Sequence, residues 1–259
     1  MKIIVLVKQV PDTWGDRKLN PATGLLDRGA SEAIIDEIGE RALEVALSHQ
    51  DSADAEVVAL TMGPASATGM LRKALAMGAD SAVHVLDDAL AGSDLGWTAT
   101  VLAAAITKSG YDLVVAGNES TDGRGGAVAA MVAEHLGVPH VTNLNSVEIA
   151  PDSVRGERGT EHGTLSVHAS LPAVISITEL SAEPRFPNFK GIMRAKKKPL
   201  DVWTLGDVGL DPATAFAGTG HSVVLNTSQR PARTAGTKVV DSGNAGTELA
   251  EFLAARHLI

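Results

Sequence analysis

The feature that most constrains the fold is a regular alternation of short apolar runs with helical segments in the first half of the chain. The runs are short and rich in β-branched residues, which is typical of strands that helices cover on both faces. Because each run is followed by a helix, the pattern predicts an α/β fold with a parallel sheet joined by right-handed crossovers. The expected strands are residues 2–7, 55–61, 82–86 and 111–116, and the expected helices are 37–48, 70–77, 97–108 and 127–136.

A glycine-rich loop follows the strand expected at 111–116 and leads into the helix expected at 127–136. It contains three glycines within four residues, at positions 123, 125 and 126. Glycines let backbone N–H groups turn toward one point, and the helix N-terminus adds partial positive charge there. The loop therefore predicts a phosphate-binding site. One alternative stays open: the glycines make only a turn, and Thr121 or Asp122 caps the helix.

Two common phosphate-binding motifs do not match this loop. A Walker loop would end in Gly-Lys-Ser or Gly-Lys-Thr, which is not present here. A dinucleotide fingerprint beginning at Gly123 would need a third glycine at position 128, where the chain has Val128.

Composition and charge exclude several classes of protein. Hydrophobic residues make up 44% of the chain and aromatic residues only 3%, so we expect a core of Ala, Val, Leu and Ile. The net charge of −9 disfavours nonspecific binding to nucleic acid. No segment approaches the roughly 20 apolar residues of a membrane span, and the N-terminus is typical of a first strand rather than a signal peptide. With no cysteine present, we expect a cytoplasmic protein without membrane insertion.

The second half of the chain has a different pattern. Strands are expected at 145–150, 164–169 and 173–178, with a hairpin tip at 155–163, and residues 183–191 are expected to form an exposed loop carrying Phe186 and Phe189. A basic run at 192–199 follows, for which a solvated helix end is the alternative interpretation. Residues 214–226 are weakly patterned, 227–243 are loop-like, and 247–257 form an amphipathic helix. We therefore predict a domain at 1–226 and an arm at 227–259 that docks on a partner.

Catalytic motifs are not evident in the sequence. The eight histidines are scattered, no zinc-ligand spacing is present, and no Gly-x-Ser-x-Gly elbow occurs. We therefore expect neither a metal site nor a catalytic site of the chain's own.

Several motifs together resemble the beta subunit family of electron-transfer flavoproteins (ETF). They occur in family order over nearly the whole chain, at residues 7–13, 62–64, 73–80, 117–123, 171–176, 183–187, 192–198 and 233–238. The resemblance implies an adenine-nucleotide-hydrolase-like fold without hydrolysis, that is, a doubly wound parallel sheet with a C-terminal extension of strands, a recognition loop and a terminal helix. It also implies a heterodimer with an ETF alpha subunit that holds most of one FAD, and an electron carrier rather than an enzyme.

The resemblance further implies a structural AMP in this subunit. Its contacts would be Leu6, Asp36, Glu37, Ile38, Gly39, Met62, Gly117, Asn118, Ser120, Thr121, Asp122, Gly123, Gly125, Gly126, Ala127 and Val128. The phosphate would meet the backbone of the last four. Thr13 and Trp14 would approach the FAD, although Trp14 could instead cover the edge of the core.

The resemblance also implies docking of acyl-CoA and related dehydrogenases, with electrons passing to an ETF-quinone oxidoreductase. Residues 184–198 resemble the recognition loop that docks these donors. In the alternative interpretation, Phe189 fills this subunit's own core instead of contacting a donor. The docking residues would be Phe189, Ile192, Met193, Arg194, Lys196 and Lys197, with Lys198 adding to the charge that steers approach.

The sequence departs from the family pattern at three positions. Leu165 stands where Glu or Gln is usual, Asp36 where Asn is frequent, and Phe189 where the docking anchor is commonly Leu. Three other functions are weighed beside the AMP-binding carrier. A beta subunit of a bifurcating flavoprotein would bind a second FAD in place of AMP. A stand-alone stress-sensor-like domain would end near residue 150. An ATP-cleaving ligase would need a Ser-Gly-Gly-x-Asp-Ser loop where residues 8–12 lie.

Overall fold

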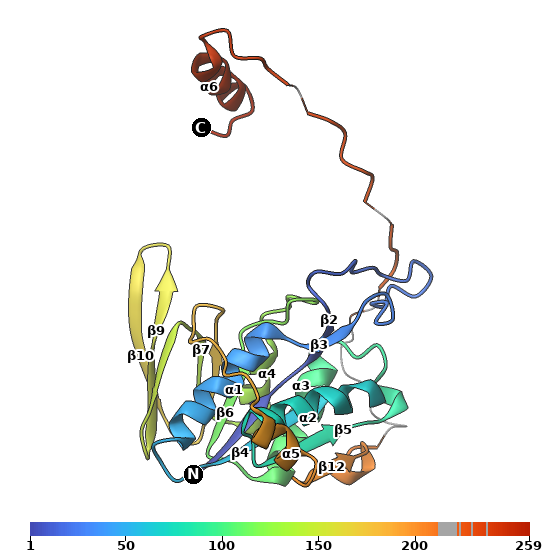
Figure 1. The fold of residues 1–259 in the computed structure, drawn as a ribbon, viewed down its shortest axis with the longest axis vertical. Coiled ribbons are helices and arrows are strands. Elements are labelled where there is room, and N and C mark those ends of the chain that lie inside the picture. The colour runs from blue at the N-terminus through green and yellow to red at the C-terminus, as the bar shows by residue number, and fades with distance from the viewer. Residues whose placement is uncertain (212–221, 223, 229, 237) are drawn as a thin grey trace.

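The computed structural model describes residues 1–211, 222, 224–228, 230–236 and 238–259, and its centre is a seven-stranded sheet (Figure 1). Every neighbouring pair of strands in this sheet is parallel. The predicted α/β fold with a parallel sheet is confirmed. Across the sheet the order is β12 (Leu200–Trp203), β5 (Ser81–Val85), β4 (Glu56–Met62), β1 (Lys2–Leu6), β6 (Leu113–Gly117), β11 (Ala173–Ile177) and β7 (His140–Leu144).

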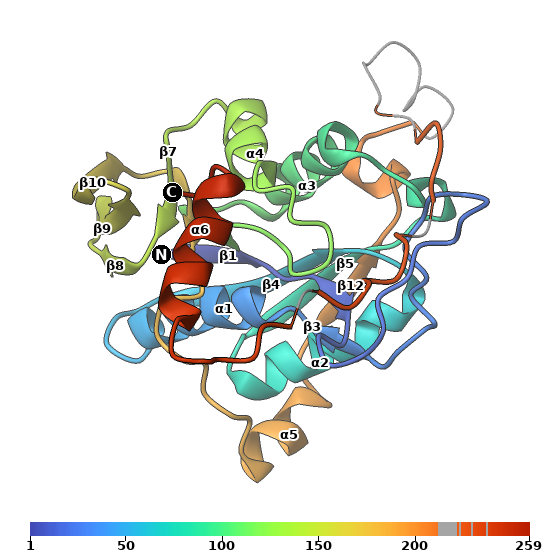
Figure 2. The same ribbon diagram turned by 90° about the horizontal axis from the view of Figure 1, so that it is seen from above.

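Helices cover both faces of the sheet, as Figure 2 shows. On one face α1 (Glu37–Gln50) and α2 (Thr68–Met77) pack on Ile3, Val5 and their neighbours in adjacent strands. On the other face α3 (Leu95–Ser109) and α4 (Val128–Leu136) pack on Ile4 and its neighbours. Successive strand residues thus enter opposite apolar layers, which explains why the strands read as continuous apolar runs.

The strands after residue 139 belong to two different sheets. β7, β11 and β12 complete the central sheet, so part of the expected extension belongs to it. The other three form a separate antiparallel sheet made of β8 (Ser146–Ile149), β9 (Ser153–Thr160) and β10 (Gly163–Ser170). β7, β9 and β12 were not predicted. Two antiparallel strands of three residues each, β2 (Gln9–Pro11) and β3 (Ala33–Ile35), were also not predicted.

The expected hairpin tip at 155–163 is wrong. Residues 153–160 form β9 and pair in continuous register with β10, from Ser153 opposite Ser170 to Thr160 opposite Gly163. Polar residues and glycines suggested a loop, but the glycine at 156 has a packing role. A Cβ atom there would lie 2.2 Å from the carbonyl oxygen of Ser146 in β8, so the close strand pairing requires glycine.

The exposed loop expected at 183–191 is correct only for residues 183–188, because the next residue begins α5 (Phe189–Ala195). Asn188 caps this helix: its side-chain oxygen accepts a hydrogen bond from the Gly191 amide at 2.8 Å. The remaining helical turns are η1 (Ala65–Ala67), η2 (Asp88–Leu90) and η3 (Gly206–Val208). Most of the weakly patterned stretch 214–226 lies outside the described residues.

The chain ends in α6 (Ala245–Ala255), which confirms a terminal helix close to the predicted position. Figure 1 shows α6 apart from the sheet and its covering helices, at the end of an extended arm. None of its residues is buried, and Leu249 and Phe252 are exposed one turn apart. Within the described ranges, no helix has both the length and the apolar character needed to cross a bilayer. The division into a domain and an arm at residue 226 stays a prediction.

Candidate functional site

A large cavity lies where the chain reverses its direction across the sheet. After β1 the chain adds β4 and β5 on one side and then returns to place β6 on the other side. Ligands of open α/β sheets bind in the crevice that such a reversal leaves at the carboxyl ends of the strands. Here a cavity of about 1250 Å³ is lined by Leu6, Met62 and Ala116, at the carboxyl ends of β1, β4 and β6. A second cavity of about 660 Å³, beside Met1 and Asp112, contains none of the predicted site residues.

The cavity brings together most of the residues predicted from the sequence. Those that line it are Leu6, Asp36, Gly39, Met62, Gly117, Asn118, Ser120, Gly123, Gly125, Gly126 and Val128. Glu37, Ile38, Thr121, Asp122 and Ala127 belong to the same loop and helix ends but lie behind this lining. The glycine-rich loop, residues 117–128, therefore forms one wall of the cavity.

Asp36 joins this loop to α1. One carboxylate oxygen of the buried Asp36 accepts hydrogen bonds from the backbone amide and the hydroxyl of Thr121, both at 2.7 Å. The other oxygen caps α1 by accepting a hydrogen bond from the Ile38 amide at 3.0 Å. Both oxygens are thus held by protein donors, so Asp36 fixes the loop against the start of the helix.

Lys8, just after the end of β1, holds the middle of the loop. Its ammonium donates hydrogen bonds to Asp122 at 2.7 Å and to the Ser120 hydroxyl at 3.0 Å. Burial raises the pKa of the Asp122 carboxyl. The hydrogen bond and the charge of Lys8 lower this pKa by a larger amount, so the net pKa lies below its ordinary value. Asp122 is therefore an anion at neutral pH whose charge Lys8 balances.

Arg17 links the loop to the segment that follows β1. Its guanidinium donates to the carbonyl and the hydroxyl of Thr121, and also to the carbonyl of Pro11 at 2.6 Å. Sequence reasoning missed both Lys8 and Arg17. The only signal for Lys8 was its place directly beyond the carboxyl end of the first strand, and Arg17 gave none.

The start of α4 presents backbone donors toward the cavity. The N-cap residue of α4 is Ala127, and no described side chain caps the helix. The alternative that Thr121 or Asp122 caps it is therefore wrong, because those side chains bind Asp36 and Lys8 instead. The first N–H groups of an α-helix have no partner inside the helix, so here they can bind an anion. Gly126, just before the helix, has φ of +64°, and a Cβ atom there would meet nothing within 4 Å.

Asn118 adds a polar acceptor to the same cavity. Its side-chain oxygen is buried and accepts no hydrogen bond from the described residues, although the residue lines the cavity. Buried acceptors of this kind normally have a partner. The set of groups fits a phosphorylated nucleotide: helix amides for phosphate, Asn118 for a hydroxyl or amino donor, and apolar walls from Leu6, Leu60 and Met62 for a base.

Thr13 and Trp14 lie outside this cavity. The Thr13 hydroxyl donates to the Glu37 carboxylate at 3.0 Å, and the Trp14 side chain is 95% exposed. Trp14 therefore does not cover the edge of the core, which rules out that interpretation. Its approach to a flavin stays a prediction.

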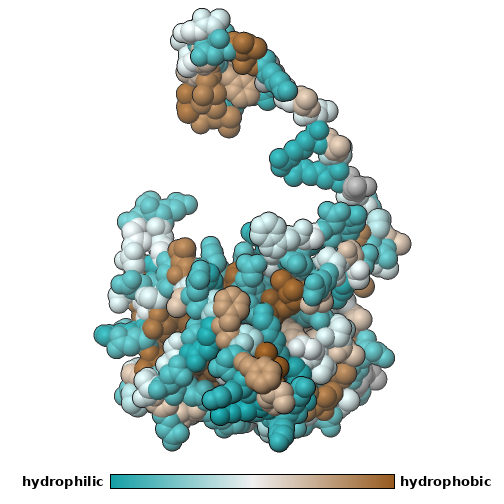
Figure 3. Space-filling model, in the orientation of Figure 1, coloured by the Kyte–Doolittle hydropathy of each residue, from teal (hydrophilic) through white to brown (hydrophobic). Residues whose placement is uncertain are grey.

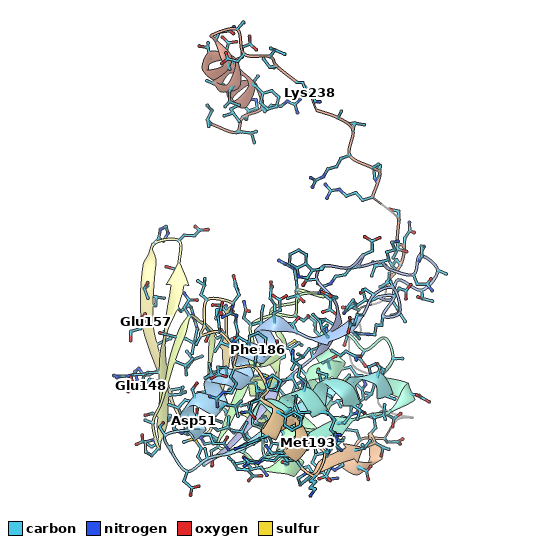
Figure 4. The ribbon with its side chains drawn as sticks, in the orientation of Figure 1. Asp51, Glu148, Glu157, Phe186, Met193 and Lys238 are labelled. Carbon is cyan, nitrogen blue, oxygen red and sulfur yellow. The ribbon has the colours of Figure 1, made fainter. Side chains whose placement is uncertain are left out.

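A second candidate surface surrounds α5. We call Phe186, Phe189, Ile192 and Met193, all exposed, together with the exposed cations Arg194, Lys196 and Lys197, the docking surface. Figure 4 places Phe186 and Met193 on the same side of the molecule, where Figure 3 shows apolar side chains among hydrophilic ones. Phe189 is 78% exposed, so the alternative that it fills the core of this subunit is wrong. Lys198 differs from its neighbours, because its ammonium binds backbone carbonyls of α2 and its neighbouring turn.

Arg185 fixes the segment that leads to the docking surface. Its guanidinium and its backbone amide bind the Glu44 carboxylate of α1 at 2.8–2.9 Å, and the guanidinium also binds Asp51 at 2.7 Å. Burial raises the pKa of Glu44. The hydrogen bonds and charge of Arg185 lower this pKa by a larger amount, together with a hydrogen bond from Ser48, so the net pKa is below its ordinary value. These pairs bind the segment to the sheet-covering helix α1.

Comparison with known proteins agrees with this geometry. The model of the electron transfer flavoprotein domain matches residues 23–208. The chain is 49% identical to the electron transfer flavoprotein subunit beta of Mycobacterium tuberculosis, over 99% of both chains. It is 35% identical to the subunit of the same name from Thermoanaerobacterium thermosaccharolyticum over the full length of both, and 34% identical to the caffeyl-CoA reductase-Etf complex subunit CarD of Acetobacterium woodii, over 99% of this chain and 97% of that one. Since the similarity is this high over nearly full length, the chain belongs to the electron transfer flavoprotein beta subunit family.

Proposed function

We propose that this beta subunit keeps one AMP in the 1250 Å³ cavity as a permanent structural ligand. The observation that carries the proposal is the meeting, in one cavity, of the uncapped start of α4 and the unpartnered oxygen of Asn118. Helix amides bind phosphate, and a buried acceptor without a partner favours a ligand that donates. Lys8 and Asp36 hold the loop in the required shape.

The flavin proposal extends this role to the partner subunit. Membership of the family implies a heterodimer with an ETF alpha subunit. We propose that the alpha subunit binds most of one FAD, with this chain completing the site near Trp14. The 95% exposure of Trp14 supports the proposal, because a large aromatic side chain held in solvent gains most by being covered on association.

The docking proposal concerns the electron donors. An apolar cluster with an exposed cationic border suits a partner that has an apolar pocket and an acidic rim. We propose that acyl-CoA and related dehydrogenases dock here, and that the electrons continue to an ETF-quinone oxidoreductase in the cytoplasm or at its membrane. The names of two relatives, a caffeyl-CoA reductase complex subunit and an acryloyl-CoA reductase electron transfer subunit, support partners that act on CoA thioesters.

A second candidate is the beta subunit of a bifurcating flavoprotein, which would bind a second FAD instead of AMP. The cavity volume of about 1250 Å³ favours this candidate, because drug-sized ligands occupy pockets of roughly 300–1,000 Å³. The uncapped α4 start suits a phosphate from either nucleotide, so a direct measurement must decide between them.

The test is nucleotide analysis of the heterodimer. The chain is coexpressed with an alpha subunit, purified, denatured and chromatographed. One AMP and one FAD per heterodimer supports the proposal, whereas two FAD and no AMP replaces it with the bifurcating candidate. Tight stoichiometric FAD binding by the isolated chain would contradict the shared flavin site.

A further inference from the structure

α2 and α5 pack against each other, although the two helices are far apart in sequence. The ammonium of Lys198, just after α5, donates hydrogen bonds to three carbonyls at the end of α2 and in its following turn: Leu75 at 3.2 Å, Gly78 at 2.9 Å and Ala79 at 2.6 Å. Lys198 is half-buried, and burial together with the charge of Arg194 lowers its pKa, while the carboxylate of Asp80 partly offsets this shift. A cation at this place satisfies carbonyls that a helix leaves unpaired and opposes the negative end of its dipole.

The reverse contact is made by Arg72 of α2. One guanidinium nitrogen donates to the carbonyls of Ala195, the last residue of α5, at 2.8 Å, and of Lys198 at 3.1 Å. Each helix therefore receives its C-terminal cap from a cation of the other. Lys196 and Lys197, the neighbours of Lys198, are exposed and belong to the docking surface instead.

The two helices also touch through their backbones. A Cβ atom at Gly191 would lie 2.3 Å from the carbonyl oxygen of Ala76, so only glycine permits this approach. α5 has seven residues, and isolated helices shorter than about 12–15 residues are marginal in water. Its conformation therefore depends on α2 and on the reciprocal caps.

We propose that Arg72 and Lys198 are positioning residues that hold the docking surface in its binding conformation before a donor dehydrogenase arrives. The inference rests on the proposed docking function and adds the groups that make the surface rigid. Order present in the free protein reduces the entropy lost on association, so removal of a cap weakens docking without altering the residues that touch the donor.

The test compares Arg72→Met and Lys198→Met with Arg155→Met as the matched control, because Arg155 is an exposed cation on β9 that lies outside the docking surface. Methionine keeps an apolar stem and removes the charged donor in all three variants. Each is purified as the heterodimer and assayed as electron acceptor for an acyl-CoA dehydrogenase at about 0.5 M salt, where steering by exposed charge is screened to a few ångströms. Backbone hydrogen exchange of α5 and α1 is measured on the same samples.

We expect Arg72→Met and Lys198→Met each to raise KM for the heterodimer at least fivefold with kcat and flavin content unchanged. We also expect at least tenfold faster exchange in α5 with no change in α1. Arg155→Met should change neither quantity, and Lys198→Arg should restore most of the affinity. An unchanged KM or unchanged α5 exchange in both Met variants overturns the positioning role.

A truncation in the docking surface separates this inference from the docking proposal on which it rests. If Met193→Ala raises KM while Arg72→Met and Lys198→Met do not, docking stands and the positioning role fails. If Met193→Ala and Phe189→Ala both leave KM unchanged, the docking proposal itself fails, and the inference with it.

Discussion

Two glycines near the ends of α4 share a backbone conformation but differ in their surroundings. Gly126 has φ of +64° and lines the cavity, whereas Gly137 has φ of +65° and ends the helix outside the cavity. At both positions a Cβ atom would meet nothing within 4 Å. A side chain at either glycine position therefore carries the same backbone strain, about 1–2 kcal/mol. Only a side chain at position 126 would face the cavity.

We therefore expect Gly126→Val to lose AMP and Gly137→Val to keep it. The valine at 126 keeps a phosphate away from the backbone amides at the start of α4, while the strain common to both variants is controlled. The measurement is chromatography of nucleotides released from each purified heterodimer after denaturation. Equal AMP in the two variants would place the phosphate elsewhere.

The Glu44 carboxylate gives a pH-dependent prediction. Its pKa is lowered in the folded protein, so it stabilises the fold above the ordinary glutamate pKa of about 4.3, and this contribution is lost as pH falls through the folded pKa. We expect Glu44→Gln to lower the free energy of unfolding by about 1.5–3 kcal/mol at pH 7, and by much less once the pH has fallen below the lowered folded pKa, where wild type also loses the charge.

Urea unfolding of the chain at the two pH values measures this difference. Glu148→Gln is the matched control, because Glu148 pairs with Arg155 on the exposed small sheet, with both side chains about two-thirds exposed. Its effect should stay below about 1 kcal/mol at both pH values. A Glu44→Gln deficit that persists unchanged in acid would mean that the ion pair is not its source.

At the scale of elements, the sequence patterns predicted the repeating units and missed those that depend on distant partners. β1, β4, β5 and β6 follow directly from apolar runs because both faces of each strand are buried. β9 was missed because its outer face is polar and its glycine at 156 serves a neighbouring strand. The end of α5 fits the alternative interpretation of the basic run as a solvated helix end, but the start of the helix at Phe189 was missed. Its conformation depends on Arg72, which caps its C-terminus from more than 120 residues earlier in the chain.

The candidate site divides in the same way. The glycine-rich loop was predictable as one wall because its glycines and the following helix are consecutive in sequence. The opposite wall was not predictable, because it collects Leu25, Arg28 and Val224 from segments far apart in the chain. The contacts from Lys8 and Arg17 to the loop likewise span more than 100 residues.

Phe189 provides the prediction that belongs to α5 as an element. Because the side chain is 78% exposed at the first residue of the helix, Phe189→Ala should leave the melting temperature unchanged. Loss of an aromatic anchor costs roughly 2 kcal/mol or more, so flavin reduction by a donor dehydrogenase should slow at least tenfold.

Stopped-flow reduction beside a thermal melt measures both quantities. Leu165→Ala, a truncation of a half-exposed apolar side chain on β10, is the control and should leave reduction unchanged. A destabilised Phe189→Ala protein with normal transfer would remove Phe189 from the docking surface.

At the scale of the whole molecule, the arm and α6 extend away from the rest of the chain, and Figure 4 places Lys238 along this arm. Figure 3 shows apolar side chains at the surface of the terminal helix. The exposed apolar residues of α6 include Leu249 and Phe252. An exposed apolar helix face is typical of a surface that a partner covers.

We expect truncation after Lys238 to weaken binding of the alpha subunit at least tenfold and to leave the melting temperature of the isolated chain unchanged. The sheet and its covering helices do not depend on α6, since none of its residues is buried. Titration with labelled alpha subunit measures the affinity, and Phe252→Ala should reproduce part of the loss. Unchanged affinity in the truncated protein would exclude α6 from the interface.

The attachment of residues 183–198 has a consequence for how donor preference could change among relatives. This segment is anchored at one end by Arg185 on α1 and at the other by Lys198 on α2, and neither anchor lines the cavity beside the glycine-rich loop. The exposed residues between the anchors can therefore vary while the rest of the protein is conserved. A chimera that carries another family member's residues 186–197 should adopt that member's choice of dehydrogenase and retain its own AMP, so that the segment behaves as an exchangeable cassette.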